Sequence, residues 1–181
     1  DMRRSAKTKA ARSAQYLVIG PWTHLFNTAR AIGEVDYGPE ALVDLDEGLS
    51  GYQITRLGHS VQSATRAWRD GADIDWVVGA LLHDIGDGLA PQNHDRMSAE
   101  VIRPFVREEV SWVVEHHGIF QMLYYGHHYG WDRNARDRYK DHPSFGACAA
   151  FCERWDQTSF DPDYDSEDLE FFEPMVREVF G

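Results

Sequence analysis

The chain has 181 residues, 43% of them hydrophobic and 13% aromatic, and a formal net charge of -12. Such a composition indicates a globular protein with a substantial core and excludes an intrinsically disordered chain. Because nucleic acids and anionic membranes bind basic surfaces, the acidic excess argues against either as a partner. The charge says little about a small-molecule substrate.

We expect one helical domain over residues 21–181, preceded by a frayed lead-in over residues 1–20. The lead-in is basic, but it lacks the apolar segment of a secretory signal. Cys148 and Cys152 lie four residues apart on a predicted helix, which favours a reduced, buried pair over a disulfide. A reduced pair is typical of a cytoplasmic protein, which is the location we expect. No stretch is long and apolar enough to span a bilayer.

Apolar residues recur with helical spacing along almost the whole chain, and no segment alternates as a half-buried strand does. A first helix, which contains His59, ends at Gly71, and Asp73 is a good N-cap for the next one. Residues 87–93 and 118–143 are expected to be irregular. The remaining predicted helices cover residues 95–103, residues 108–117, residues 144–158, and a last segment capped by Ser166 and interrupted near Pro174. We therefore predict an all-α fold, a compact helical bundle.

The pair His83-Asp84 is the most informative feature of the chain, because an apolar helix ends there in two adjacent polar side chains. Burying either side chain without a partner is costly. A divalent metal ion removes that cost, since imidazole and carboxylate both bind such ions. The chain offers several further ligands of these types: His59, His94, His116, His117 and Asp156.

One arrangement with two metal ions satisfies these residues. Asp84 has two oxygens and would bridge the ions, and the six ligands together would leave open positions for water, substrate or oxygen. The other five ligands divide between the two ions: His59, His83 and Asp156 on the first, His94 and His117 on the second. Each of these residues taken alone is more often a surface residue or a satisfied polar group of the core, and His94 in particular lies in a polar stretch.

Helical phase distinguishes His117 from His116. The valines at positions 110, 113 and 114 define a buried face that includes His117, so His116 is expected to support a ligand or to face solvent. His127 and His128 lie in an irregular segment and suit a lid or a polar surface. His24 and His142 are expected to be structural.

The order of these residues resembles the HD-domain superfamily of metal-dependent enzymes, over roughly residues 52–160. Two extra histidines before the last aspartate are similar to the di-iron oxygenase branch, which includes myo-inositol oxygenase and a phosphonate-cleaving enzyme. The segments that carry the resemblance are His59-Ser60-Val61-Gln62-Ser63-Ala64, Leu81-Leu82-His83-Asp84-Ile85-Gly86 and Arg154-Trp155-Asp156.

The resemblance implies two iron ions, Fe(II) and Fe(III), that bind a substrate hydroxyl and activate dioxygen, after which a C–C or C–P bond is cleaved. The partners would then be dioxygen and a small hydroxylated molecule. The ligand set carried over from the branch is the one given above, with Asp84 as the bridge.

Two positions depart from the branch, and both are candidate substrate-binding residues. Asp87 stands where those oxygenases have Lys or His, and Gln121 stands where the phosphonate enzyme has Lys. An acid and an amide weaken the case for a phosphonate, because such anions favour Lys or Arg. Asp87 would suit an ammonium group or a polyol, or it braces its loop. The Tyr and Glu that precede the first ligand in the phosphonate enzyme are not obvious either, and Tyr52 is the nearby aromatic residue.

Two other functions remain open. A metal-dependent phosphohydrolase, acting on a phosphate ester or nucleotide with Mn, Zn or Mg, would use a metal-activated water to attack phosphorus. A non-catalytic, metal-stabilised domain would hold coordinatively filled ions. The hydrolase would need basic side chains at the site, and five are the nearest candidates: Arg96, Arg103, Arg133, Arg136 and Arg138.

Overall fold

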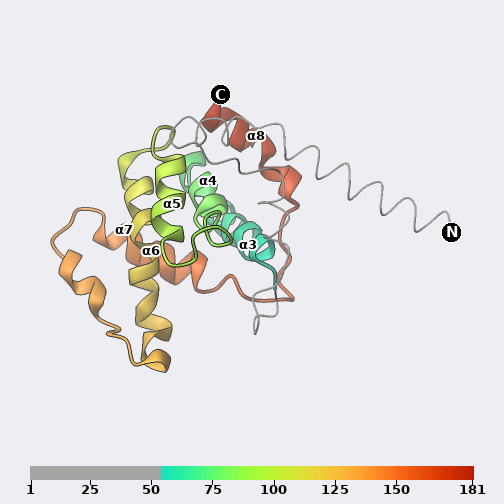
Figure 1. The fold of residues 1–181 in the computed structure, drawn as a ribbon. Helices are drawn as coiled ribbons and strands as arrows, with labels where there is room; N and C mark the ends of the chain where they lie inside the picture. The colour runs from blue at the N-terminus through green and yellow to red at the C-terminus, as the bar shows by residue number, and fades with distance from the viewer. Residues whose placement is uncertain (1–53) are drawn as a thin grey trace.

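Residues 54–181 are described by the computed structural model, and every regular element among them is helical (Figure 1). The predicted all-α fold is confirmed. The predicted lead-in over residues 1–20, Tyr52 and His24 lie outside the described residues. The α-helices are α3 (Arg56–Arg69), α4 (Ile74–Leu82), α5 (His94–Ile102), α6 (Glu108–Tyr125), α7 (Phe145–Phe151) and α8 (Leu169–Phe180).

The centre of the fold is α4, which packs against α3, α6 and α8. Its residues from Val77 to Leu82 are all buried, as expected of a helix that is apolar on every side. Both α3 and α4 begin at side-chain caps: Thr55 accepts a hydrogen bond from the backbone N–H of Gly58, and Asp73 accepts one from that of Trp76. The predicted cap at Asp73 is confirmed.

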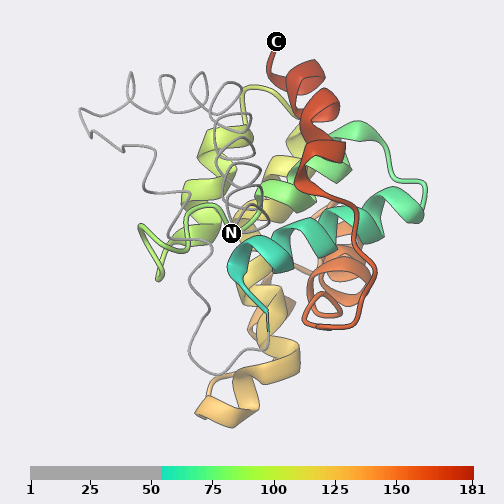
Figure 2. The same ribbon diagram turned by 90° about the vertical axis from the view of Figure 1, so that its right-hand side faces the viewer.

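The prediction that regular structure ends at residue 117 is wrong, because α6 runs on to Tyr125. A Cβ atom at Gly118 would lie 3.2 Å from Oδ2 of Asp95 on α5. This glycine therefore permits close packing of α5 against α6 and does not end the helix. The chain becomes irregular after residue 125, where the 3-10 turns η2 (Gly126–Tyr129) and η3 (Ala135–Tyr139) project from the body of the molecule (Figures 1 and 2).

The C-terminal part also departs from the prediction. Helix α7 continues into one turn of π-helix, η4 (Cys152–Asp156), and α8 begins after Asp168 instead of Ser166. Pro174 lies inside α8 without interrupting it. The buried side chains Phe172, Val176 and Phe180 recur every four residues, so one face of α8 packs on the core and holds the helix together. Cys148 and Cys152 are free and buried, as predicted.

Among the described residues, no helix combines the length and the apolar character that crossing a bilayer requires.

Gly79 allows α4 to approach α6 closely, and this contact gives a test of the packing. An added Cβ would lie 2.6 Å from Cγ1 of Val110, a β-branched side chain with little freedom to move. We expect Gly79→Ala to lower the free energy of unfolding by about 1–3 kcal/mol, although alanine favours helix. The measurement is denaturant unfolding. Gly146→Ala is the matched control, because nothing lies within 4 Å of the methyl group that alanine would add there, and it should not destabilise the protein.

Candidate metal centre

Six side chains from five parts of the fold converge on one buried centre. They come from the first turn of α3, the end of α4, the first residue of α5, the middle of α6 and the last residue of the π-turn η4. They are the six residues that the sequence predicted as ligands: His59, His83, Asp84, His94, His117 and Asp156. His59 and Asp156 lie 97 positions apart in the sequence, so only the folded chain brings these side chains together.

The first group of ligand atoms comprises His59, His83 and Asp156. The Nε2 atoms of the two histidines are 3.1 Å apart. Oδ1 of Asp156 lies 3.3 Å from Nε2 of His59 and 3.7 Å from Nε2 of His83. All three side chains are buried. Their ligand atoms lie within 4.8 Å of one another, close enough for one metal ion to bind all three.

The second group comprises His94 and His117, whose Nε2 atoms are 3.3 Å apart. Asp84 stands between the groups. Its Oδ1 lies 3.4 Å from Nε2 of His94 and 3.1 Å from Nε2 of His117. Its Oδ2 lies 3.6 Å from Nε2 of His59 and 3.5 Å from Nε2 of His83. Each oxygen of Asp84 therefore faces one group, which is the geometry of a bridging carboxylate.

Backbone carbonyls fix the protonation of all four rings. Each Nδ1 lies within hydrogen-bond distance of a carbonyl oxygen: 2.8 Å to Ser159 from His59, 2.7 Å to Ala80 from His83, 2.9 Å to Pro91 from His94, and 2.7 Å to Val114 from His117. A carbonyl oxygen only accepts, so each Nδ1 carries a proton and the neutral ring presents the Nε2 lone pair to the centre.

These lone pairs cannot hydrogen-bond to one another, and Oδ2 of Asp156 is buried without a hydrogen-bond partner. Four lone pairs and two carboxylates facing one another repel unless a proton or a cation lies between them. Histidines that bind metal ions through one nitrogen commonly donate the other N–H to a carbonyl, as all four do here. The donor set therefore fits divalent metal ions.

The charges of the cluster raise the pKa values of three of its histidines and lower those of its two aspartates. Burial opposes protonation of His59, His83 and His117, but the neighbouring carboxylates outweigh burial and raise the pKa of each ring. Burial likewise disfavours the ionised carboxylates, yet the surrounding imidazoles hold the pKa of Asp84 and that of Asp156 well below the usual range. In the absence of metal, protons bound to these histidines reduce the repulsion that a metal ion would otherwise remove.

The segment after Asp156 holds the first ligand in position. The ring of Phe160 stacks on the imidazole of His59 with centroids 4.3 Å apart, next to the Ser159 carbonyl that accepts from it. Gln62 anchors this segment: its Nε2 donates to the carbonyl of Asp161 at 2.8 Å, and its Oε1 accepts from the N–H of Asp161 at 3.2 Å. Sequence analysis missed this support. The available signal was a buried amide three residues after His59 on the same helix.

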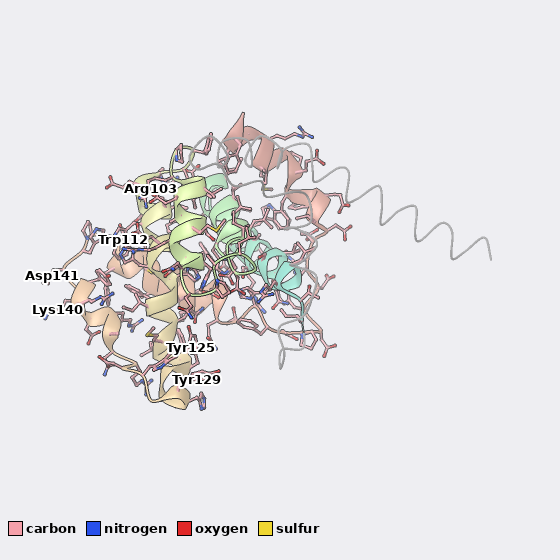
Figure 3. All side chains as sticks on the ribbon, in the orientation of Figure 1. Arg103, Trp112, Tyr125, Tyr129, Lys140 and Asp141 are labelled. Atoms are coloured by element: carbon pink, nitrogen blue, oxygen red, sulfur yellow. The ribbon has the colours of Figure 1, made fainter. Side chains whose placement is uncertain are left out.

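The remaining histidines lie away from the centre. His116 stacks on Trp112, which also stacks on His142 with ring centroids 4.0 Å apart, on the side of α6 that faces the loop carrying Lys140 and Asp141 (Figure 3). His127 and His128 are exposed on η2. Helical phase thus distinguished His117 from His116 correctly, and His142 is structural as predicted.

Of the two candidate substrate-binding residues, Gln121 is buried one turn beyond His117, and its Oε1 has no hydrogen-bond partner. Asp87 forms an ion pair with Arg56, a residue that sequence analysis did not consider. This ion pair supports the alternative in which Asp87 braces its loop.

Within the part of the chain that the structure describes, none of the five basic residues considered for a hydrolase is seen in contact with the cluster. Arg103 forms ion pairs with Glu100 and Glu115, and Arg136 lies over the rings of Phe120 and Phe145. The other three are exposed: Arg96, Arg133 and Arg138.

Comparison with known proteins agrees with this geometry. The sequence profile of the HD domain matches residues 56–158, from the first residue of α3 to just beyond Asp156. The chain belongs to the HD domain family. The predicted resemblance is thereby confirmed. HD domains bind metal ions, and two groups of side chains could each hold one: His59, His83 and Asp156, and His83, Asp84 and His117. Family and geometry together support a metal-dependent HD enzyme.

The HD chain also resembles a characterised enzyme over part of its length. It is 32% identical over 83 residues to the [1-hydroxy-2-(trimethylamino)ethyl]phosphonate dioxygenase (glycine-betaine-forming) of Leisingera caerulea. The aligned stretch covers 40% of this chain and 42% of that protein. The chain therefore spans less than half of the relative's length.

The pKa shifts predict that the metal-free HD domain loses stability as the pH rises. Stabilisation by the three histidines is complete below their ordinary pKa of 6.5 and is lost as the pH passes through their raised values. The two carboxylates contribute fully above their ordinary pKa of 3.8 and lose that contribution only in stronger acid. Denaturant unfolding of metal-free protein should thus give a smaller free energy at about pH 8.5 than at about pH 6.5.

Metal-loaded protein should show the opposite trend, because metal ions bind neutral imidazoles and compete with protons. The same titration with saturating metal is the comparison. A metal-free protein whose stability stays constant or rises between these pH values would contradict the electrostatic account.

Proposed function

We propose that this HD domain is a di-iron oxygenase that cleaves a C–P or C–C bond of a small hydroxylated substrate. The main support for the proposal is the position of Asp84 between two pairs of histidines. One of its oxygens faces Nε2 of His59 and of His83, and the other faces Nε2 of His94 and of His117. A shared carboxylate between two ligand groups supports a pair of ions over a single one. The similarity to a phosphonate dioxygenase supports oxygen chemistry at that pair.

In this proposal His59, His83 and Asp156 hold the first iron, His94 and His117 the second, and Asp84 bridges them. The iron pair, when bound, supplies one-electron chemistry and a place for dioxygen and the substrate hydroxyl. The protein contributes the rest: carbonyls orient the four rings, the two carboxylates offset the charge of the ions, and the apolar residues around the cluster exclude water.

The substrate class follows from the polar groups beside the ligands. Gln121 lies on the same face of α6 as His117 and offers a buried acceptor oxygen to a substrate O–H or N–H. The relative is named for a hydroxylated phosphonate that carries an amine. We therefore favour an aminophosphonate-type substrate over a polyol.

A metal-dependent phosphohydrolase is the second candidate, because a pair of Mn, Zn or Mg ions in the same ligand set could activate water and stabilise charge on phosphorus. Both reactions release phosphate from a phosphorus compound. They differ in that only the oxygenase consumes dioxygen.

The ligand assignment predicts different losses of metal from two variants. Asp84→Ala should reduce the metal content from about two ions per chain to about none, because it removes the bridge and leaves four imidazoles facing one another. His94→Ala should chiefly lose the second ion, since the first group remains complete. Metal analysis after reconstitution is the measurement, and Asp141→Ala on the exposed loop is the control. Two ions retained by Asp84→Ala would exclude a bridging role.

The reaction is tested with iron-reconstituted protein and a series of hydroxylated phosphonates, aminophosphonates and polyols. Oxidative cleavage of a 1-hydroxyphosphonate converts one substrate and one dioxygen into one carboxylate and one phosphate, so we expect oxygen uptake and phosphate release in equal amounts. An EPR signal of a mixed-valence iron pair should change when the substrate is added. Hydrolysis of phosphate esters without oxygen, by protein containing only zinc or manganese, would reject the oxygenase.

A further inference from the structure

Arg56 is the basic side chain that the described residues connect to the metal centre. It lies on α3 one turn before His59, and its Nε donates to Oδ2 of Asp87. The other oxygen of Asp87 lies 3.9 Å from Nδ1 of His94. Asp87 thus lies beside His94, a ligand of the second group. Its partner Arg56 lies one turn before His59, a ligand of the first group.

The ion pair is sheltered from solvent, because the exposed fractions of the Arg56 and Asp87 side chains are 18% and 17%. A guanidinium in such a place has more donors than one carboxylate uses. Arg56 engages Asp87 through Nε, and among the described residues no contact of its two terminal NH2 groups is seen. Those groups form the planar fork that binds phosphate-like oxyanions through two parallel hydrogen bonds.

The overall charge of the centre also favours an anion at this place. A pair of metal ions would bring at least four positive charges, five for Fe(II) with Fe(III), and Asp84 and Asp156 offset only two of them, while Arg56 and Asp87 cancel each other. A substrate whose hydroxyl reaches the ions therefore meets a net positive field, and its second polar group needs a donor a few ångströms away.

We propose that Arg56 binds the phosphorus oxyanion of the substrate, and that Asp87 positions the Arg56 guanidinium for this purpose. The proposal rests on the metal centre of the proposed function, but it applies equally to a phosphonate and to a phosphate ester. Asp87 then does not select a cationic substrate. Arg56 is the specificity-determining residue, and Asp87 acts through it.

The test measures binding of methylphosphonate to the metal-reconstituted full chain under nitrogen, by calorimetry, without any turnover. We expect Arg56→Gln to weaken the Kd at least tenfold, whereas Arg56→Lys should lose less because it keeps the charge without the fork. Asp87→Asn should weaken binding by a smaller factor than Arg56→Gln. Arg96→Gln, an exposed arginine on α5, is the matched control and should bind as the unaltered chain does.

The metal content and the thermal unfolding of each variant show whether weaker binding results from loss of the ions or of the fold. If Arg56→Gln does not fold, Arg56→Lys takes its place in the comparison. Equal Kd values for Arg56→Gln, Arg96→Gln and the unaltered chain, at equal metal content, would overturn the role of Arg56. That result would leave oxygen-dependent cleavage intact. Conversely, weakened binding by Arg56→Gln in a protein that hydrolyses phosphate esters without oxygen would support Arg56 and reject the oxygenase.

Discussion

The mutual repulsion of four imidazole lone pairs and two carboxylates is the constraint on which the rest of this structure depends. Each ring has its Nδ1 proton committed to a backbone carbonyl, so none can turn to relieve the repulsion without losing that hydrogen bond. The folded chain therefore contains a repulsive interaction that a bound cation would remove. A metal ion bound at this centre would therefore stabilise the folded HD domain.

The two ligand groups differ in how firmly the fold holds them. The first group lies on α3, α4 and the π-turn, and its side chains are at most 5% exposed. The second depends on His94, which follows the turns after Asp84 and has a side chain 24% exposed. His94 is thus the most exposed of the six side chains, and Asp87, which pairs with Arg56, lies beside it.

The sequence was enough to predict the helical fold, and apolar helical patterns place His59, His83 and His117 on buried faces. The ligand chemistry of Asp84, His94 and Asp156 was needed to connect them with these histidines. The sequence pattern misplaced the end of α6, since Gly118 serves a close approach to Asp95 that only the tertiary packing reveals. The predicted interruption of α8 near Pro174 was also wrong, because packing of Phe172 and Val176 on the core outweighs the effect of the proline. Arg56 went unnoticed because the local pattern does not connect it with Asp87, 31 residues away.

The turn of π-helix between Cys152 and Asp156 has a consequence for how this chain can vary. A regular α-helix advances about 100° per residue, so an extra residue accommodated within one turn rotates everything after it relative to everything before it. Here that rotation lets Phe151 face the core while Asp156 faces His59 and His83. Shortening this turn by one residue would tighten it into ordinary helix and swing the Asp156 carboxylate aside. The length of the segment is therefore under stricter constraint than its composition.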